Sequence, residues 1–234
     1  MCIRDRHSNP AWRSAFIGQA TPASEGLAFR TLLHAPASVG ETDRRRDQQS
    51  FVERLMQRGD YQRAYLAWVN FLPASQSDQV KAIYDGDFKG LPGIEPFNWS
   101  LTSNELASAE RRSDSSLPGR SALDVNFFGS DSAVIANQTL FVQPGAYVFK
   151  AVGSADGGGQ FAGTLRWQLS CIPSGATFPL AVINRFDGRP VAFQHAVDLP
   201  QQGCEAQRLL LVGEPGEVST LIHAQFTGLR LEPR

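Results

Sequence analysis

Hydrophobic and polar residues follow one period before about residue 80 and a different period after it. In the first part, apolar residues recur at the spacing that places them on one face of a helix. The clearest runs are Phe51, Val52, Leu55 and Met56, and then Tyr61, Ala64, Tyr65, Trp68 and Val69. Thr42 is a candidate N-cap, and Gly59 and Pro73 are stop signals. With two shorter apolar stripes at 10–17 and 25–33, the pattern predicts a helical segment over residues 7–75.

Beyond residue 80, apolar and polar residues alternate in short runs that Gly and Pro separate. In 164–171, Leu165, Trp167 and Leu169 fall on one face, and Arg166 and Gln168 fall on the other. This period of two is typical of strands. Similar runs occupy 83–88, 97–101, 121–127, 133–142, 147–149, 180–184, 191–197, 208–212 and 218–231. Nine or ten short strands with no helical period between them predict one β-sandwich over residues 80–234.

The composition narrows the function classes. The chain has 234 residues, of which 42% are hydrophobic and 19% charged, with a net charge of -1. No apolar run reaches the roughly 18–20 residues that span a membrane. A charge close to zero gives no reason to expect a nucleic-acid partner. Neither a Gly-x-Ser-x-Gly nucleophile motif nor a phosphate-binding glycine loop occurs, so we expect no enzyme.

The first six residues need separate treatment. Residues 1–6 resemble translated adapter sequence at the ends of metagenome-derived reading frames, and we expect them to be an artefact rather than part of the fold. The alternative is an ordinary basic N-terminus. On the first interpretation the chain is a fragment, and the signal sequence is missing from it together with the true start.

Two further cysteines remain, Cys171 at the end of a predicted strand and Cys204 in a loop. Two cysteines without a histidine at ligand spacing cannot build a four-ligand zinc site. We therefore expect a Cys171–Cys204 disulfide, with two independent buried thiols as the alternative. A disulfide indicates an oxidising compartment, and closing a loop of about 30 residues contributes roughly 3 kcal/mol in the chain-entropy model.

Residues 51–68 resemble a tetratricopeptide-like helix–turn–helix. Gly59, Tyr61 and Ala64 stand where such a repeat places its turn glycine, a packing aromatic and a small residue. A single unit cannot bury its own apolar face, whereas stacked repeats do. The resemblance implies degenerate helical hairpins at the end of a repeat array. A plain helical linker is the alternative.

The second part of the chain is similar to a jelly-roll domain of the galactose-binding or carbohydrate-binding-module type. The segments that carry this similarity are 84–88, 96–101, the turn at 144–147 and 165–171. More narrowly, the chain resembles the C-terminal part of proteobacterial envelope proteins in which such a sandwich follows tetratricopeptide repeats. The resemblance thus implies a mainly β fold, a jelly roll preceded by a short α-helical segment.

This resemblance also implies two kinds of site. Asp85 and Asp87 match the carboxylates that hold a structural calcium ion in many such modules, although Lys89 stands where an acid is usual. We expect no other cofactor. The candidate ligand-binding residues are aromatic, amide and guanidinium side chains: Trp99, Arg166, Gln168, Arg185 and Phe186. Trp167 is expected in the core, and His195 is expected to share the inward face of its strand.

We therefore expect a non-catalytic binding or assembly protein of the bacterial envelope, periplasmic or secreted. Its partner would be a glycan or an envelope protein. One alternative is a purely structural cap of a repeat array that mediates protein–protein interaction. Another is an accessory domain of a polysaccharide-processing enzyme.

Overall fold

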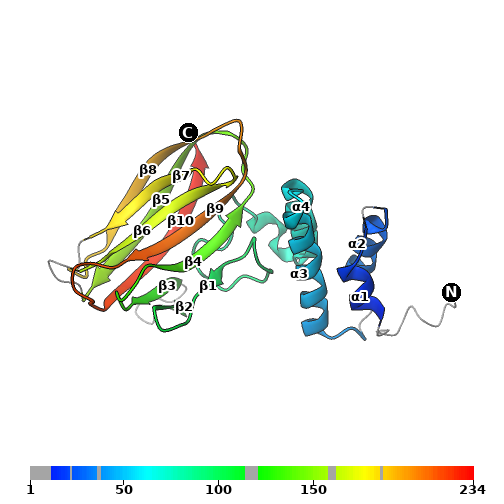
Figure 1. Ribbon diagram of the computed structural model, residues 1–234, viewed down its shortest axis with the longest axis horizontal. Coiled ribbons are helices and arrows are strands. Elements are labelled where there is room, and N and C mark those ends of the chain that lie inside the picture. Colours follow the sequence, from blue (N-terminus) through cyan, green and yellow to red (C-terminus); the bar gives the residue numbers. More distant parts are fainter. Residues whose placement is uncertain (1–11, 22, 36–37, 114–120, 158–161, 185–186) are drawn as a thin grey trace. The chain divides into compact units, whose positions relative to one another are not determined.

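The computed structural model describes residues 12–21, 23–35, 38–113, 121–157, 162–184 and 187–234 (Figure 1). The chain divides into two compact units, which we describe separately. One comprises residues up to Asp78 together with Pro92–Glu95, and the other comprises Gln79–Leu91 and Pro96–Arg234. None of the helices in the described residues has the length and apolarity required to cross a bilayer.

The first unit is helical, as the sequence predicts. Its helices are α1 (Trp12–Gly18), α2 (Glu25–Leu33), α3 (Glu41–Gln57) and α4 (Tyr61–Phe71), followed by the short 3-10 helix η2 (Ala74–Gln79). Helix α3 packs against each of α1, α2 and α4. Gly59 joins α3 to α4 in the left-handed conformation, with φ of 77°, which glycine adopts without strain. The helix–turn–helix predicted at 51–68 is therefore present.

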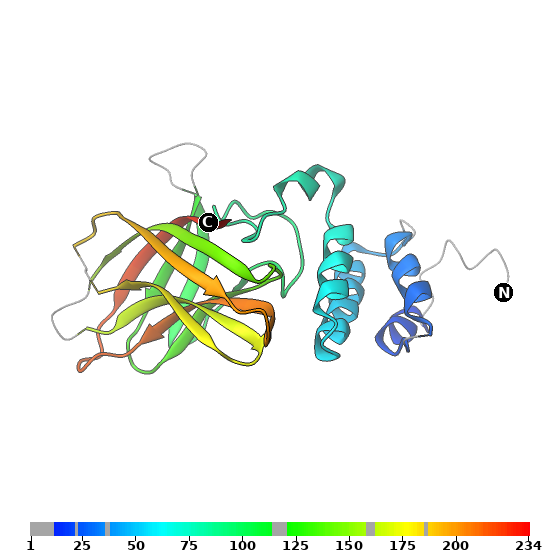
Figure 2. The ribbon, with the colours of Figure 1, turned by 90° about the horizontal axis from the view of Figure 1, so that it is seen from above.

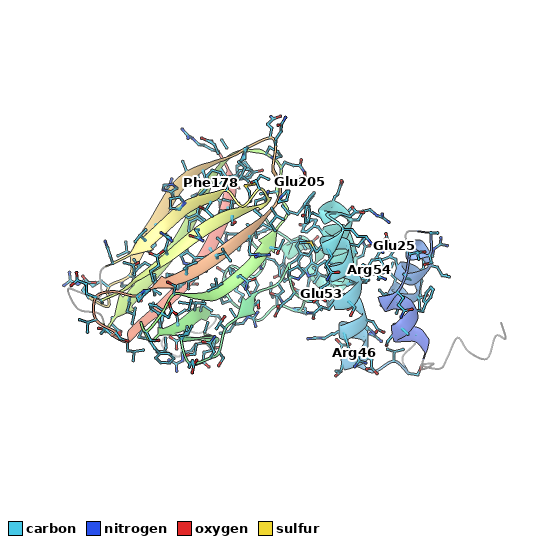
Figure 3. The ribbon with its side chains drawn as sticks, viewed as in Figure 1. Glu25, Arg46, Glu53, Arg54, Phe178 and Glu205 are labelled. Carbon is cyan, nitrogen blue, oxygen red and sulfur yellow. A yellow bond between two sulfur atoms is a disulfide. The ribbon has the colours of Figure 1, made fainter. Side chains whose placement is uncertain are left out.

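Buried charges fix the packing of the helical unit. Arg13 on α1 forms an ion pair with Asp47 on α3, and both side chains are buried. Glu25 on α2, labelled in Figure 3, is also buried and pairs with Arg58 and Arg63. A buried charge without its partner is costly, so these pairs hold the helices in one arrangement.

The second unit is a jelly-roll β-sandwich of ten described strands (Figures 1 and 2). Their bounds are β1 (Ser100–Leu101), β2 (Ala107–Ser113), β3 (Ser121–Phe127), β4 (Ala133–Leu140), β5 (Gly145–Asp156), β6 (Thr164–Pro173), β7 (Thr177–Ile183), β8 (Val191–Leu199), β9 (Cys204–Glu214) and β10 (Ile222–Pro233). The first sheet has the order β1-β4-β9-β6-β7, and the second has the order β2-β3-β10-β5-β8. All pairings are antiparallel.

Three strand predictions need correction. Residues 83–88 form turns rather than a strand, and only Ser100–Leu101 of the predicted 97–101 strand pairs with a neighbour. Strand β2, rich in charged residues, was not predicted because its apolar alternation is weak. It exists because it pairs along its whole length with β3, a tertiary contact that no local pattern records.

The sandwich core is built from the inward-facing residues of both sheets. Trp167 on β6 is fully buried at its centre, as the alternation predicts. Its ring lies edge-on to Phe226 on β10, with centroids 5.5 Å apart, and edge-on to Trp99 at 5.9 Å. Such edge-to-face pairs stabilise a core beyond the area that they bury.

Cys171 and Cys204 form a disulfide, as the sequence predicts. It joins the end of β6 to the start of β9, two strands that already pair in the first sheet. The bond closes a loop over a sequence separation of 33. In the chain-entropy model a loop of this size contributes roughly 3–4 kcal/mol to folding.

Candidate functional site

The turn at residues 84–88 is the first region where a site was expected. Asp85 adopts a left-handed conformation with φ of 49°. Its carboxylate accepts hydrogen bonds from the backbone N–H groups of Lys89, Gly90 and Leu91 at 2.8–3.2 Å. Burial raises the pKa of Asp85, against the lowering effect of these three donors. Asp85 therefore acts as an internal cap of the turn.

Asp87 is paired with an arginine. One Nη atom of Arg230 on β10 lies 2.7 and 2.8 Å from the two carboxylate oxygens of Asp87. Burial alone would raise the pKa of Asp87, but the hydrogen bond and charge of Arg230, with Lys89, lower it below its ordinary value. The carboxylate is thus held in its charged form by protein cations.

The calcium ion that the resemblance implies does not fit these residues. Both aspartates already accept hydrogen bonds from protein donors, and two cations, Arg230 and Lys89, lie beside Asp87. Among the described residues, no group of three or more His, Cys, Asp or Glu side chains could hold a metal ion. Calcium is held mainly by carboxylate and carbonyl oxygens, and the two carboxylates of this turn already accept bonds from protein donors.

Trp99 does not lie at the surface. It is 4% exposed and packs against Phe88, with ring centroids 4.9 Å apart. Its indole N–H donates to the carbonyl of Asp85 at 3.1 Å, which anchors the turn to the sandwich. The prediction of a ligand-contacting Trp99 is corrected on this ground, because a buried ring cannot stack on a sugar. Arg185 and Phe186 lie outside the described residues.

Arg166 and Gln168 lie on the outer face of the first sheet, as their alternation with Trp167 predicts. Arg166 forms an ion pair with Glu214 on β9. Across the neighbouring strands, Arg166 is opposite Val212 and Val182, and Gln168 is opposite Leu210 and Pro179. Their surroundings are therefore mainly aliphatic. His195 is opposite buried Phe149 and so shares the inward face of its strand, as expected, but it is exposed because β8 is an edge strand.

The outer face of the second sheet carries a hydrogen-bonded group that we call the Asp124 cluster, comprising Asp124, His223, Gln225 and Arg112. The Asp124 side chain on β3 is only 4% exposed. Its Oδ1 atom lies 2.8 Å from Nε2 of His223 and accepts a bond of 3.1 Å from the Gln225 amide. Arg112 Nη1 lies 3.1 Å from Oδ2. Three side chains from β2 and β10 thus converge on one carboxylate.

Strand register explains this convergence. β10 lies between β3 and β5 (Figure 1). His223 is opposite Asn126 on β3 and Asp156 on β5, while Gln225 is opposite Asp124 and Ser154. Because residues two apart on a strand share a face, these polar side chains form two adjacent rows across the sheet.

The charge state of His223 is set by its two acidic neighbours. Its Nδ1 atom lies 3.5 Å from Asp156, on the side opposite Asp124. Burial lowers the pKa of His223, but the hydrogen bonds and charges of Asp124 and Asp156 outweigh it, so the pKa lies above the ordinary value of 6.5. The imidazole therefore holds its proton more tightly than a free histidine does, between carboxylates of β3 and β5.

The sequence interpretation missed this cluster. No local motif points to it, because Asp124 lies 99 residues before His223 in the chain. A usable signal was present: Asp124 and Asn126 alternate with buried Leu123 and Val125, which marks them as outward-facing polar residues. Their pairing with β10, however, is a property of the sheet topology alone.

No protein-family model and no curated protein matches this chain. Among solved structures, the chain is similar to the C-terminal family 22 carbohydrate-binding module of Clostridium thermocellum Xyn10B, at 16% identity and a TM-score of 0.44 over 64% of this chain and 92% of that one. It is similar to TmCBM61, in complex with β-1,4-galactotriose, at 12% identity and a TM-score of 0.44 over 66% and 99%. It is also similar to a xylan-binding domain from family 22, at 15% identity and a TM-score of 0.44 over 66% of this chain and 96% of that one.

These structural neighbours are jelly-roll domains of carbohydrate-binding modules. The fold of this chain is defined by its own sheet order. Function has to be inferred from the side chains of this chain.

Proposed function

We propose that this chain is a non-catalytic glycan-binding protein whose ligand lies on the outer face of the second sheet. The observation that carries the proposal is the Asp124 cluster. A buried carboxylate that orients an imidazole, an amide and a guanidinium is costly to place on a sheet face unless those groups are needed in fixed positions.

The groups on this face suit sugar hydroxyls, which both donate and accept hydrogen bonds. Gln225 donates its amide N–H to Asp124, and Asn126 directs its N–H toward Ser108 Oγ at 3.4 Å. The side-chain oxygens of these two amides accept no hydrogen bond from the described residues. Two acceptors held in place by their own donors can therefore receive ligand hydroxyls without further ordering.

Binding to a panel of polysaccharides tests this proposal. Affinity electrophoresis followed by calorimetry should detect at least one neutral glycan, and Gln225→Ala should weaken it about tenfold, equivalent to ~1.4 kcal/mol. Gln168→Ala on the first sheet is the matched control, and it should leave the affinity unchanged. If Gln168→Ala weakens binding and Gln225→Ala does not, the site lies instead at Arg166 and Gln168 on the first sheet. If the chain binds no glycan, the proposed function is refuted.

The helical unit supports a second interaction, with a protein. An apolar groove of about 210 Å³ lies among α2, α3 and α4, lined by residues that include Phe29, Phe51, Leu55 and Leu66. Leu66 is half exposed at its rim. We propose that the degenerate repeat holds an envelope protein through this groove, so that the whole chain links a partner to a glycan.

The bacterial periplasm or cell exterior is the proposed compartment, because the Cys171–Cys204 disulfide persists in oxidising surroundings. Fractionation of cells that produce this protein, with thiol labelling of Cys171 after denaturation because the residue is buried, tests this placement. Labelling without prior reduction would contradict it.

A further inference from the structure

Two loops bring apolar side chains to the surface beside the Asp124 cluster. Phe128 directly follows β3 and is 39% exposed, and Leu221 directly precedes β10 and is 49% exposed. The hydroxyl of Ser219 donates to the carbonyl of Phe128 at 3.0 Å, which ties the two loops together. We call Phe128 and Leu221 the apolar pair.

Strand alternation places the apolar pair on the same face as the cluster. Phe127 and Ile222 are opposite one another in the register, and both are fully buried. Their next neighbours, Phe128 and Leu221, therefore turn to the outer side. Phe128 continues the ladder, because its N–H donates to the carbonyl of Leu106 at 3.0 Å.

The distance between the apolar pair and the polar residues follows from strand geometry. Phe128 is two residues from Asn126, and Leu221 is two residues from His223. Two residues along a strand span about 7 Å, roughly the size of one sugar ring with its substituents. One sugar residue can therefore contact the amide, the imidazole and the apolar pair together.

The charges of this face favour an uncharged ligand. Three cations of this face, on β2, β5 and β10, are each matched by a carboxylate of the protein. Arg112 pairs with Asp124 and Glu110, Lys150 with Glu232, and Arg230 with Asp87. His223 lies between Asp124 and Asp156. An acidic sugar would have to break one of these pairs to bind.

We propose, building on the glycan-binding function above, that Phe128 and Leu221 form a subsite for an apolar substituent, an O-acetyl or methyl group, on a neutral glycan. A leucine side chain has no flat face for a sugar ring and no polar atom for a hydroxyl, so it gains most from covering a methyl group. Two side chains beside polar rows are also far smaller than the roughly 800 Å² per partner of a standard protein interface.

The test uses xylohexaose and β-1,4-galactotriose, each lightly O-acetylated and each again after mild alkali has removed the acetyl groups. Dissociation constants are measured by calorimetry for the full chain, for Phe128→Ala and Leu221→Ala, and for Val182→Ala as control. Val182 is an exposed aliphatic residue on β7, in the first sheet. The wild type and Val182→Ala should prefer the acetylated sugar about fourfold, the ratio given by burial of one methylene-sized group.

Loss of this preference in Phe128→Ala and Leu221→Ala, with binding of the deacetylated sugar retained, supports the subsite. Equal binding of both forms by the wild type overturns it while leaving the glycan-binding function intact. If both variants still prefer the acetylated sugar, the subsite is also overturned. The apolar pair would then be better explained as a contact for a protein partner. If neither sugar binds in either form and no glycan of the wider panel binds, the proposed function itself fails.

Discussion

The carboxylate of Asp124 and the imidazole of His223 lie 2.8 Å apart, although 99 residues separate them in the chain. The contact joins β3 to β10 on the outside of the second sheet. It ties the stability of that sheet to the geometry of the proposed glycan face. Changes at either residue should therefore affect folding and binding together.

Replacing Asp124 by alanine should destabilise the sandwich by about 2 kcal/mol, because Arg112, His223 and Gln225 all lose a charged acceptor. The measurement is urea unfolding followed by tryptophan fluorescence. Asp156→Ala is the control, since the Asp156 side chain is 59% exposed and makes one long contact. Equal losses for both variants would show that the cluster is not a stabilising unit.

Stability should depend on pH through His223. Because its folded-state pKa is raised above 6.5, the folded state holds the proton more tightly than the unfolded state does. The resulting stabilisation is complete below pH 6.5 and is lost as the pH rises through the folded-state pKa. The difference in unfolding free energy between wild type and His223→Gln should accordingly shrink from pH 5.5 to pH 8.5. A difference that grows over this range would contradict the assignment.

The turn at residues 84–88 should not need a metal. Arg230→Ala is expected to lower the unfolding free energy by about 1.5–2 kcal/mol, since Asp87 loses a two-oxygen contact with a charged donor. Excess EDTA should leave the melting temperature of the wild type unchanged. A fall in melting temperature with EDTA, restored by calcium, would show that the aspartates bind the ion after all.

Gly86 is required by close packing. A Cβ atom there would lie 2.1 Å from the carbonyl oxygen of Leu229, a backbone atom that cannot move aside cheaply. Gly86→Ala should therefore destabilise the sandwich by roughly 2 kcal/mol or more. Gly26→Ala, at a position in α2 with open space around it, should leave the sandwich transition unchanged. A Gly86→Ala variant as stable as wild type would mean that the turn does not dock on β10.

The architecture was predictable from the sequence wherever burial is periodic. Leu165, Trp167 and Leu169 alternate strictly with polar residues, so β6 and its inward face could be predicted, and the two cysteines could be paired by count. Strand β2 could not be predicted, because it depends on pairing with β3 rather than on its own side chains. The local sequence pattern indicates which residues of a strand are buried, but it does not indicate which strand pairs with which.

Trp99 was predicted to contact a ligand because its side chain is aromatic, but that feature does not show whether the ring is exposed. An aromatic residue beside a turn resembles a sugar platform, yet the indole N–H of Trp99 bonds inward to Asp85. Phe128, which is exposed, continues the outward series of Asp124 and Asn126 beyond the end of β3. The outward position of Phe128 could be predicted from the alternation along β3. The Asp124–His223 contact could be predicted only from the order of the strands in the sheet.

The central claim is that a glycan binds to the outer face of the second sheet. The most direct measurement is a titration followed by backbone amide NMR, using the neutral oligosaccharide that binds most tightly in the panel. Shift changes should be concentrated at Asp124, Asn126, His223 and Gln225, and they should saturate with the calorimetric dissociation constant. Changes confined to β6 and β9 around Arg166 and Gln168, or no saturable change at all, would contradict it.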